Sequence, residues 1–273
     1  MAVTIYTATG CARCKIAKKY MAQKGVEYRD LDIKAEGKDE FNRFYRENRK
    51  SVYRGPDGIE FPVYFDGQVV KQGLGVVVGH VSSPKVAGFF GVGLLHGEWV
   101  DGIHISQGDP EAIDELVEAL AYLKSAGMKF EMDTDGRNPQ VLERLLAEGL
   151  GDVLIVRLIG TKDMYAAQGY DLAEVEKTMA LAAKFPEYRF ALAVRPVVRP
   201  DGAVEYLKPE EAGEIAAWVK EATGGNKHPF VLTPFDLKAA ADERFAGLAP
   251  LEAKDLFIYR SKARAHQVMA AIA

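Results

Sequence analysis

The chain has 273 residues, 48% of them hydrophobic and 27% charged, a composition typical of a folded globular protein that excludes wholesale disorder. At roughly 150 residues per domain, this length predicts two domains. The 35 basic and 39 acidic residues leave a net charge of −4. That balance argues against a dedicated nucleic-acid binder, because phosphate contacts need a concentrated positive face.

The sequence contains no apolar run of the roughly 18 residues that a membrane span requires. The residues that follow Met1 also lack the pattern of a secretory signal. We therefore expect a soluble, cytoplasmic protein that binds neither membranes nor nucleic acid. Only two cysteines are present, so a scaffold of several disulfides and an all-cysteine metal site are both excluded.

The first third of the chain predicts a strand, a helix, a second strand, a second helix and a hairpin. β-Branched and aromatic residues mark the strands, good helix formers mark the helices, and Asp66-Gly67 is typical of a hairpin turn. The expected ranges are 3–7 for the first strand, 11–24 for the helix that Gly25 ends, and then 26–33, 38–50 and 62–70.

The two cysteines stand three residues apart, and Cys11 is expected at the N-terminus of the first helix. Backbone N–H groups and the positive end of the helix dipole stabilise a thiolate there, and Arg13 and Lys15 add positive charge. Cys14, one turn further, could attack a mixed disulfide formed on Cys11. Half of a zinc site and two inert thiols remain alternatives, although the five histidines show no paired spacing.

Three segments in this order resemble a glutaredoxin across roughly residues 1–79. They are Thr-Ala-Thr-Gly-Cys-Ala-Arg-Cys at 7–14, Tyr-Arg-Asp-Leu-Asp-Ile at 28–33 and Phe-Pro-Val-Tyr-Phe-Asp-Gly at 61–67. The resemblance implies a thioredoxin fold, a redox-active dithiol and a cis peptide bond before Pro62. It also implies that the backbone edge at Val63 pairs with the bound thiol substrate. The substrate-binding residues that it implies are Thr9, Arg13, Lys15, Phe61, Pro62, Val63 and Gly73.

The sequence departs from the glutaredoxin pattern in two places. Glu60-Phe61 stands where the family usually has Thr-Val, and Gln-Gly-Leu-Gly at 72–75 replaces the usual Gly-Gly pair. Both a disulfide-containing protein and glutathione therefore stay open as partners, with glutathione a candidate reductant. No bound cofactor and no metal is expected.

The remainder of the chain alternates short apolar runs with helical patterns, which predicts a parallel sheet. The expected strands are 74–79, 100–106, 128–133, 153–158, 189–194 and 230–233, and the expected helices are 111–126, 139–148, 172–184 and 209–221. About six units favour an open or partial (βα)6 TIM-like barrel over a full eightfold one. The tail is expected to begin with a strand at 256–259 and to end in an alanine-rich helix. The predicted domains are 1–79 and 80–273.

Residues 75–235 resemble the radical S-adenosylmethionine activating enzymes. The resemblance rests on Gly-Ile-His-Ile-Ser-Gln-Gly-Asp-Pro at 102–110, Asp-Thr-Asp-Gly-Arg-Asn-Pro at 133–139 and the segment 152–162. The three cluster-binding cysteines of that family are missing from the matching stretch at 81–87, so the barrel is expected to be catalytically degenerate. Ligands of such sheets bind in the loops after the strands. The candidate ligand residues there are Asp109, Asp135, Arg157 and Lys162.

Two hypotheses follow from these patterns. In the first, the chain is a thiol-disulfide oxidoreductase in which Cys11 attacks, Cys14 resolves, and the barrel serves for ligand or partner docking. In the second, it is a redox-sensing regulatory module whose barrel binds a nucleotide-like ligand or a partner protein.

Overall fold

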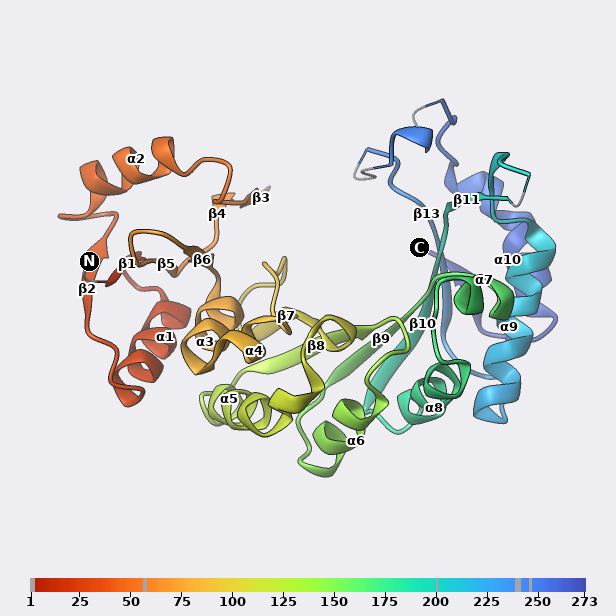
Figure 1. Ribbon diagram of the computed structural model, residues 1–273, viewed down its shortest axis with the longest axis horizontal. Helices are drawn as coiled ribbons and strands as arrows, with labels where there is room; N and C mark the ends of the chain where they lie inside the picture. The colour runs from red at the N-terminus through yellow and green to blue at the C-terminus, as the bar shows by residue number, and fades with distance from the viewer. Residues whose placement is uncertain (1–2, 56–57, 200, 239–241, 246) are drawn as a thin grey trace. The chain divides into compact units, whose positions relative to one another are not determined.

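The computed structural model describes residues 3–55, 58–199, 201–238, 242–245 and 247–273 (Figure 1). The chain divides into two compact units. The first comprises residues 1–132 and 144–152, and the second comprises 133–143 and 153–273. The boundary predicted between residues 79 and 80 falls inside helix α3 (Leu74–Ser82), within the first unit. A division into domains 1–79 and 80–273 stays a prediction.

The first unit begins with a four-stranded sheet in the order β2-β1-β5-β6. Strand β1 pairs in parallel with β2 and antiparallel with β5, and β5 pairs antiparallel with β6. This arrangement confirms the predicted order of strand, helix, strand, helix and hairpin. The strands are β1 (Val3–Thr7), β2 (Tyr28–Asp32), β5 (Val63–Phe65) and β6 (Val70–Gln72), and the short pair β3 (Arg54–Gly55) and β4 (Gly58–Ile59) was not predicted.

Successive side chains of a strand point to opposite faces of the sheet. Helices cover both of these faces. On one face, Phe41 and Phe44 of α2 (Lys38–Glu47) pack around Tyr6 of β1, with ring centroids 5.1 and 4.7 Å from the tyrosine ring. On the other face lie α1 (Ala12–Gln23) and α3, which contact each other (Figure 1).

Residues 74–79, predicted as a strand, form the first part of α3, so that prediction is wrong. The run Leu-Gly-Val-Val-Val-Gly is apolar throughout, and periodicity alone cannot tell a buried strand from a buried helix in so short a run. Leu74, Val77 and Val78 are fully buried at helical spacing. Burial against the neighbouring elements therefore overrides the β-branched composition.

The chain beyond α3 continues to pack on the same unit. Tyr122 of α5 (Ile113–Ser125) donates a hydrogen bond of 2.8 Å to the carbonyl of Ile16 in α1. Gly79 lies so close to Phe90 that an added Cβ would stand 2.4 Å from its ring. The linking elements are α4 (Pro84–Ala87), β7 (Trp99–His104) and the 3₁₀ turns η1 (Ile105–Gln107) and η2 (Pro110–Ala112).

Six strands form a second sheet in the order β14-β13-β10-β9-β8-β7. Within the second unit, β10 pairs in parallel with both β9 and β13, and β13 pairs in parallel with β14. In the described part of the chain, β7 and β14 form the two edges of this sheet. Its strands are β7, β8 (Lys129–Thr134), β9 (Val153–Leu158), β10 (Glu187–Val194), β13 (Phe230–Pro234) and β14 (Ala270–Ile272). The predicted parallel α/β sheet is thus confirmed, whereas its closure as a partial barrel stays a prediction.

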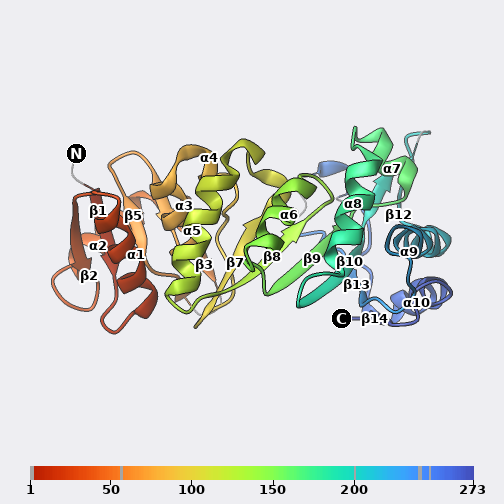
Figure 2. The same cartoon turned by 90° about the horizontal axis from the view of Figure 1, so that it is seen from below.

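Helix α8 packs against β9 and α9, and α9 packs against α10 (Figure 2). The helices are α6 (Pro139–Ala147), α7 (Lys162–Ala167), α8 (Leu172–Ala182), α9 (Pro209–Thr223) and α10 (Phe257–Arg264), with a hairpin of β11 (Pro196–Val198) and β12 (Val204–Tyr206) and the turns η3 (Glu243–Phe245) and η4 (Ala253–Leu256). The prediction of a strand at 256–259 followed by a helix is wrong, because residues 257–264 are helical and residues 270–272 form a strand. None of the described helices is both long and apolar enough to cross a membrane.

Candidate active site

The site is built at the turn between β1 and α1. After Thr7 the chain reverses through Gly10, whose φ of +79° is accessible to glycine at little cost. Cys11 then caps α1, and its sulfur accepts a hydrogen bond of 3.0 Å from the backbone N–H of Cys14. The predicted position of this sulfur at a helix N-terminus is confirmed.

Cys11 and Cys14 are joined in a disulfide, with their Cα atoms 5.3 Å apart. The two residues differ in exposure, since Cys14 is 2% exposed whereas Cys11 is only partly buried and lines a cavity. Cys11 therefore borders open space, while Cys14 faces the protein interior. The roles of Cys11 as the attacking and Cys14 as the resolving cysteine stay predictions.

The peptide bond between Phe61 and Pro62 is cis, as the resemblance implied. The next residue, Val63, is fully buried and stands opposite Tyr6 on one side and Gln72 on the other. Strand β5 thus has a neighbour on both sides at Val63, and the pairing of the Val63 backbone with a thiol substrate stays a prediction. On this segment Phe61 lines the cavity beside Cys11.

A cavity of about 460 Å³ adjoins Cys11. Phe61 and Leu94 contribute apolar walls, and Arg13, Glu60 and His96 contribute polar ones. All its lining residues belong to the first unit. The space next to the Cys11 sulfur is therefore partly enclosed, and a few identifiable side chains determine its polarity.

A buried ion pair lies in this cavity. Arg13 Nη2 is 2.9 Å from Glu60 Oε1, and the two side chains are only 12% and 9% exposed. Arg13 Nη1 donates a second bond of 2.9 Å to the carbonyl of Leu95. Burial raises the pKa of the Glu60 carboxyl, and the Arg13 guanidinium opposes that rise. Among the described residues, Glu60 Oε2 and Arg13 Nε are buried without a hydrogen-bond partner.

The segment 91–98 carries Leu94 and His96 to the cavity. The carboxylate of Asp101 holds it, accepting hydrogen bonds of 2.7 and 3.1 Å from the backbone N–H groups of Leu94 and Leu95. Sequence reasoning missed this segment, and the Leu-Leu pair between glycines carried no signal for it. The Glu60 position, in contrast, stood out as a departure from the glutaredoxin pattern.

The remaining predicted substrate residues lie around this centre. Thr9 is exposed and donates a hydrogen bond of 2.6 Å to the Asp32 carboxylate, which lowers the pKa of that carboxyl. Lys15 is exposed on α1. Gly73 caps α3, and a Cβ added there would stand 3.0 Å from Glu60 Oε1. The structure thus places Gly73 against Glu60, and the substrate-binding roles of these residues stay predictions.

Residues 3–70 match the glutaredoxin family model. The match covers both cysteines and Pro62, and it ends before Gly73 and the segment 91–98. It agrees with the predicted resemblance and supports a glutaredoxin-type domain at this end of the chain. A search of curated proteins found no match to the chain.

The four residues proposed as a barrel ligand site have different surroundings. Asp109 lies in the first unit, where it caps η2 and pairs with Lys85 at 3.3 Å. Lys162, in the second unit, is 3.2 Å from both Glu176 and Glu221. These two residues therefore support ion pairs within their own units, and a ligand role for them stays a prediction.

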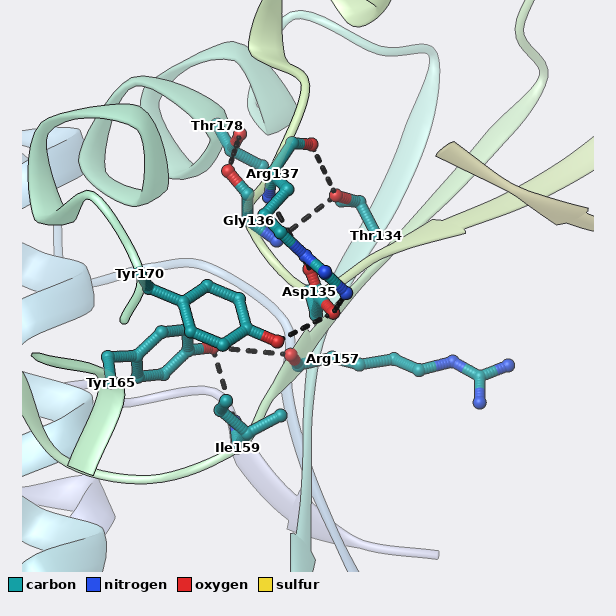
Figure 3. Close-up of polar contacts among 9 residues, drawn as sticks. All are labelled: Thr134, Asp135, Gly136, Arg137, Arg157, Ile159, Tyr165, Tyr170 and Thr178. Carbon is teal, nitrogen blue, oxygen red and sulfur yellow. Dashed lines mark hydrogen bonds and ion pairs between the residues drawn. The ribbon is translucent and has the colours of Figure 1, made fainter. Parts of the chain in front are cut away.

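The other two residues are Asp135, at the centre of a polar cluster in the second unit, and Arg157, whose backbone lies beside it (Figure 3). Arg137 and the hydroxyl of Tyr170 converge on Asp135, at 2.6 and 2.8 Å from its Oδ2. Arg157 pairs with Asp133 at 2.7 Å, and in Figure 3 its side chain extends away from this cluster. The carboxyl ends of β8 and β9 thus carry charged side chains, as predicted.

Tyr165, which sequence reasoning missed, anchors the same region. It is fully buried, and its hydroxyl accepts a hydrogen bond of 3.2 Å from Ile159 N–H and donates one of 3.4 Å to the carbonyl of Arg157 (Figure 3). A buried hydroxyl that satisfies a backbone group fixes the loop after β9. The spacing of aromatic residues in the sequence gave no indication of this role.

Proposed function

We propose that this chain is a thiol-disulfide oxidoreductase in which Cys11 is the nucleophile and Cys14 the resolving thiol. The observation that carries the proposal is the pairing of an accessible, helix-capping Cys11 with a buried Cys14 in one disulfide. The glutaredoxin family match over residues 3–70 supports the same chemistry.

The reaction begins with the reduced dithiol. The Cys11 thiolate, stabilised by the N–H groups of α1, attacks one sulfur of the substrate disulfide. A bond forms between that sulfur and Cys11, and the other substrate sulfur leaves as a thiolate. The Cys14 thiol then loses its proton to solvent and attacks Cys11, which releases the second substrate thiolate. The substrate gains two electrons, the protein disulfide forms, and an external dithiol reductant restores the starting state.

Reduction of a small mixed disulfide by the purified chain tests this proposal. With a dithiol reductant in excess, the parent protein should turn over repeatedly and Cys11→Ser should not. A Cys11→Ser protein as active as the parent would show that the nucleophile is wrongly assigned. A Lys19→Ser variant, altered at an exposed position of the same helix, serves as a control and should retain activity.

We also propose that the second unit docks a ligand or a partner at the carboxyl ends of β8 and β9. The pairing of Asp133 with Arg157 there supports binding of a charged ligand, since ligands of parallel sheets gather at this edge. Thermal unfolding of the full chain with and without S-adenosylmethionine tests one such ligand. An unchanged unfolding temperature would remove that ligand from consideration.

A further inference from the structure

The position of the Glu60 carboxylate bears on which disulfides the site accepts. Its Oε1 forms an ion pair with Arg13 Nη2 at 2.9 Å, and the other terminal nitrogen, Nη1, donates a hydrogen bond of 2.9 Å to the Leu95 carbonyl. The same carboxylate lies against Gly73 at the beginning of α3. Glu60 is therefore an internal anion, and it is paired with the guanidinium that lines the cavity beside Cys11.

The charges around Glu60 do not favour a second carboxylate. Asp101 raises the pKa of Glu60 further, whereas Arg13 and His96 lower it, so two carboxylates share this region with the guanidinium of Arg13 and the imidazole of His96. Much of the remaining wall is apolar, with Ile59, Phe61 and Leu94 lining it. A substrate carboxylate entering this cavity would lose water and find both terminal nitrogens of Arg13 already engaged by Glu60 and the Leu95 carbonyl.

We propose that Glu60 is a specificity-determining residue, which makes this site prefer a disulfide within an uncharged, apolar peptide segment over one flanked by carboxylates, such as oxidised glutathione. This inference rests on the proposed function. An apolar segment fits the Phe61 and Leu94 walls and leaves the Arg13–Glu60 pair intact. A glutathionyl group, with two carboxylates close to its sulfur, gains no ion pair from Arg13 as long as Glu60 holds it.

The test follows oxidation of the reduced chain, freed of reductant, by two disulfides. One is oxidised glutathione, and the other is the disulfide dimer of N-acetyl-Leu-Cys-Val-amide. In each case Cys11 and Cys14 lose two electrons to the added disulfide, which is released as two thiols. The rates are divided by those of free dithiothreitol with the same disulfides. We expect the neutral peptide to react about tenfold faster at pH 8.

The variant Glu60→Gln frees Arg13 and should raise the rate with oxidised glutathione, so the preference should fall at least threefold. Glu47→Gln is the matched control, because it removes the same charge from an exposed position on α2 and should leave the preference unchanged. An unchanged preference in a folded Glu60→Gln protein, judged by circular dichroism, would overturn the proposal.

A second experiment uses the unaltered chain, so its result does not depend on whether the Glu60→Gln protein folds. Oxidised glutathione with its carboxylates esterified should react several-fold faster than the free acid. Equal normalised rates for the ester, the acid and the neutral peptide would refute the role of Glu60 and leave the oxidoreductase proposal standing. Failure of all three disulfides to react would refute the proposed function itself.

Discussion

Removing the cation of the buried pair tests the energetics of the site most directly. In Arg13→Met the Glu60 carboxylate, with its side chain 9% exposed, loses its partner. Breaking a buried pair in this way costs about 3 kcal/mol. The Leu95 carbonyl also loses its donor, which adds about 1 kcal/mol. We expect a loss of about 4 kcal/mol at neutral pH, a large part of the 5–15 kcal/mol typical of a folded domain.

Urea unfolding followed by circular dichroism measures this loss from the shift in midpoint. Arg43→Met, at an exposed position of α2, is the control and should change the free energy of unfolding by less than about 0.5 kcal/mol. The deficit of Arg13→Met should shrink on acidification, because a protonated Glu60 needs no cation. A deficit below about 1 kcal/mol, the value of an exposed pair, would refute the inference that solvent is excluded from the pair.

Three further predictions follow. Cys14→Ser should stop the reaction at a mixed disulfide on Cys11, and mass spectrometry without reductant should detect that adduct. The raised pKa of Glu60 means that its protonated form favours the folded state, so the stability of the parent relative to Glu60→Gln should decrease as pH rises through and above 4.5; an increase would contradict the burial of this carboxyl. Gly79→Ala would place a Cβ 2.4 Å from Phe90 and should cost about 1–3 kcal/mol in the same urea assay; a neutral effect would show that the two do not pack so closely.

The elements that sequence predicted well are those with strong local signals. The strand β9 matches its predicted range of 153–158, and α6 begins at Pro139 as expected. Cys11 could be placed at a helix N-terminus because a strand, a glycine turn and good helix formers follow one another there. Such signals depend on residues within a few positions of each other, so no tertiary structure is needed to read them.

The elements that sequence mistook are those in which packing decides between two local solutions. Residues 74–79 are helical although three of them are valines, and residues 257–264 are helical although they begin with aromatic and β-branched side chains. The sheet has six strands, the number expected, because it includes β14 near residue 273, which was not predicted, and lacks the strand expected at 74–79. A count of strand–helix units can thus be right while the identity of one member is wrong.

The chemistry of the site could be predicted only where it depends on the cysteines themselves. Glu60 stood out as an unusual residue before Pro62, yet its pairing with Arg13 joins positions 47 apart in the sequence. The bond from Arg13 to Leu95 spans 82 positions. No periodicity or spacing rule relates residues at such distances, since their meeting depends on how α1, the cis-proline loop and the segment 91–98 are brought together.

The segment 91–98 also changes what the glutaredoxin match implies for this chain. The match ends at residue 70, but Leu94 and His96 complete the cavity beside Cys11, and the Leu95 carbonyl fixes Arg13. A piece that ended at residue 79 would keep the dithiol and lose both this wall and one partner of the guanidinium. Cys11 and Cys14 therefore lie in the part of the chain that matches the glutaredoxin family model, whereas the cavity beside Cys11 is lined also by residues beyond it.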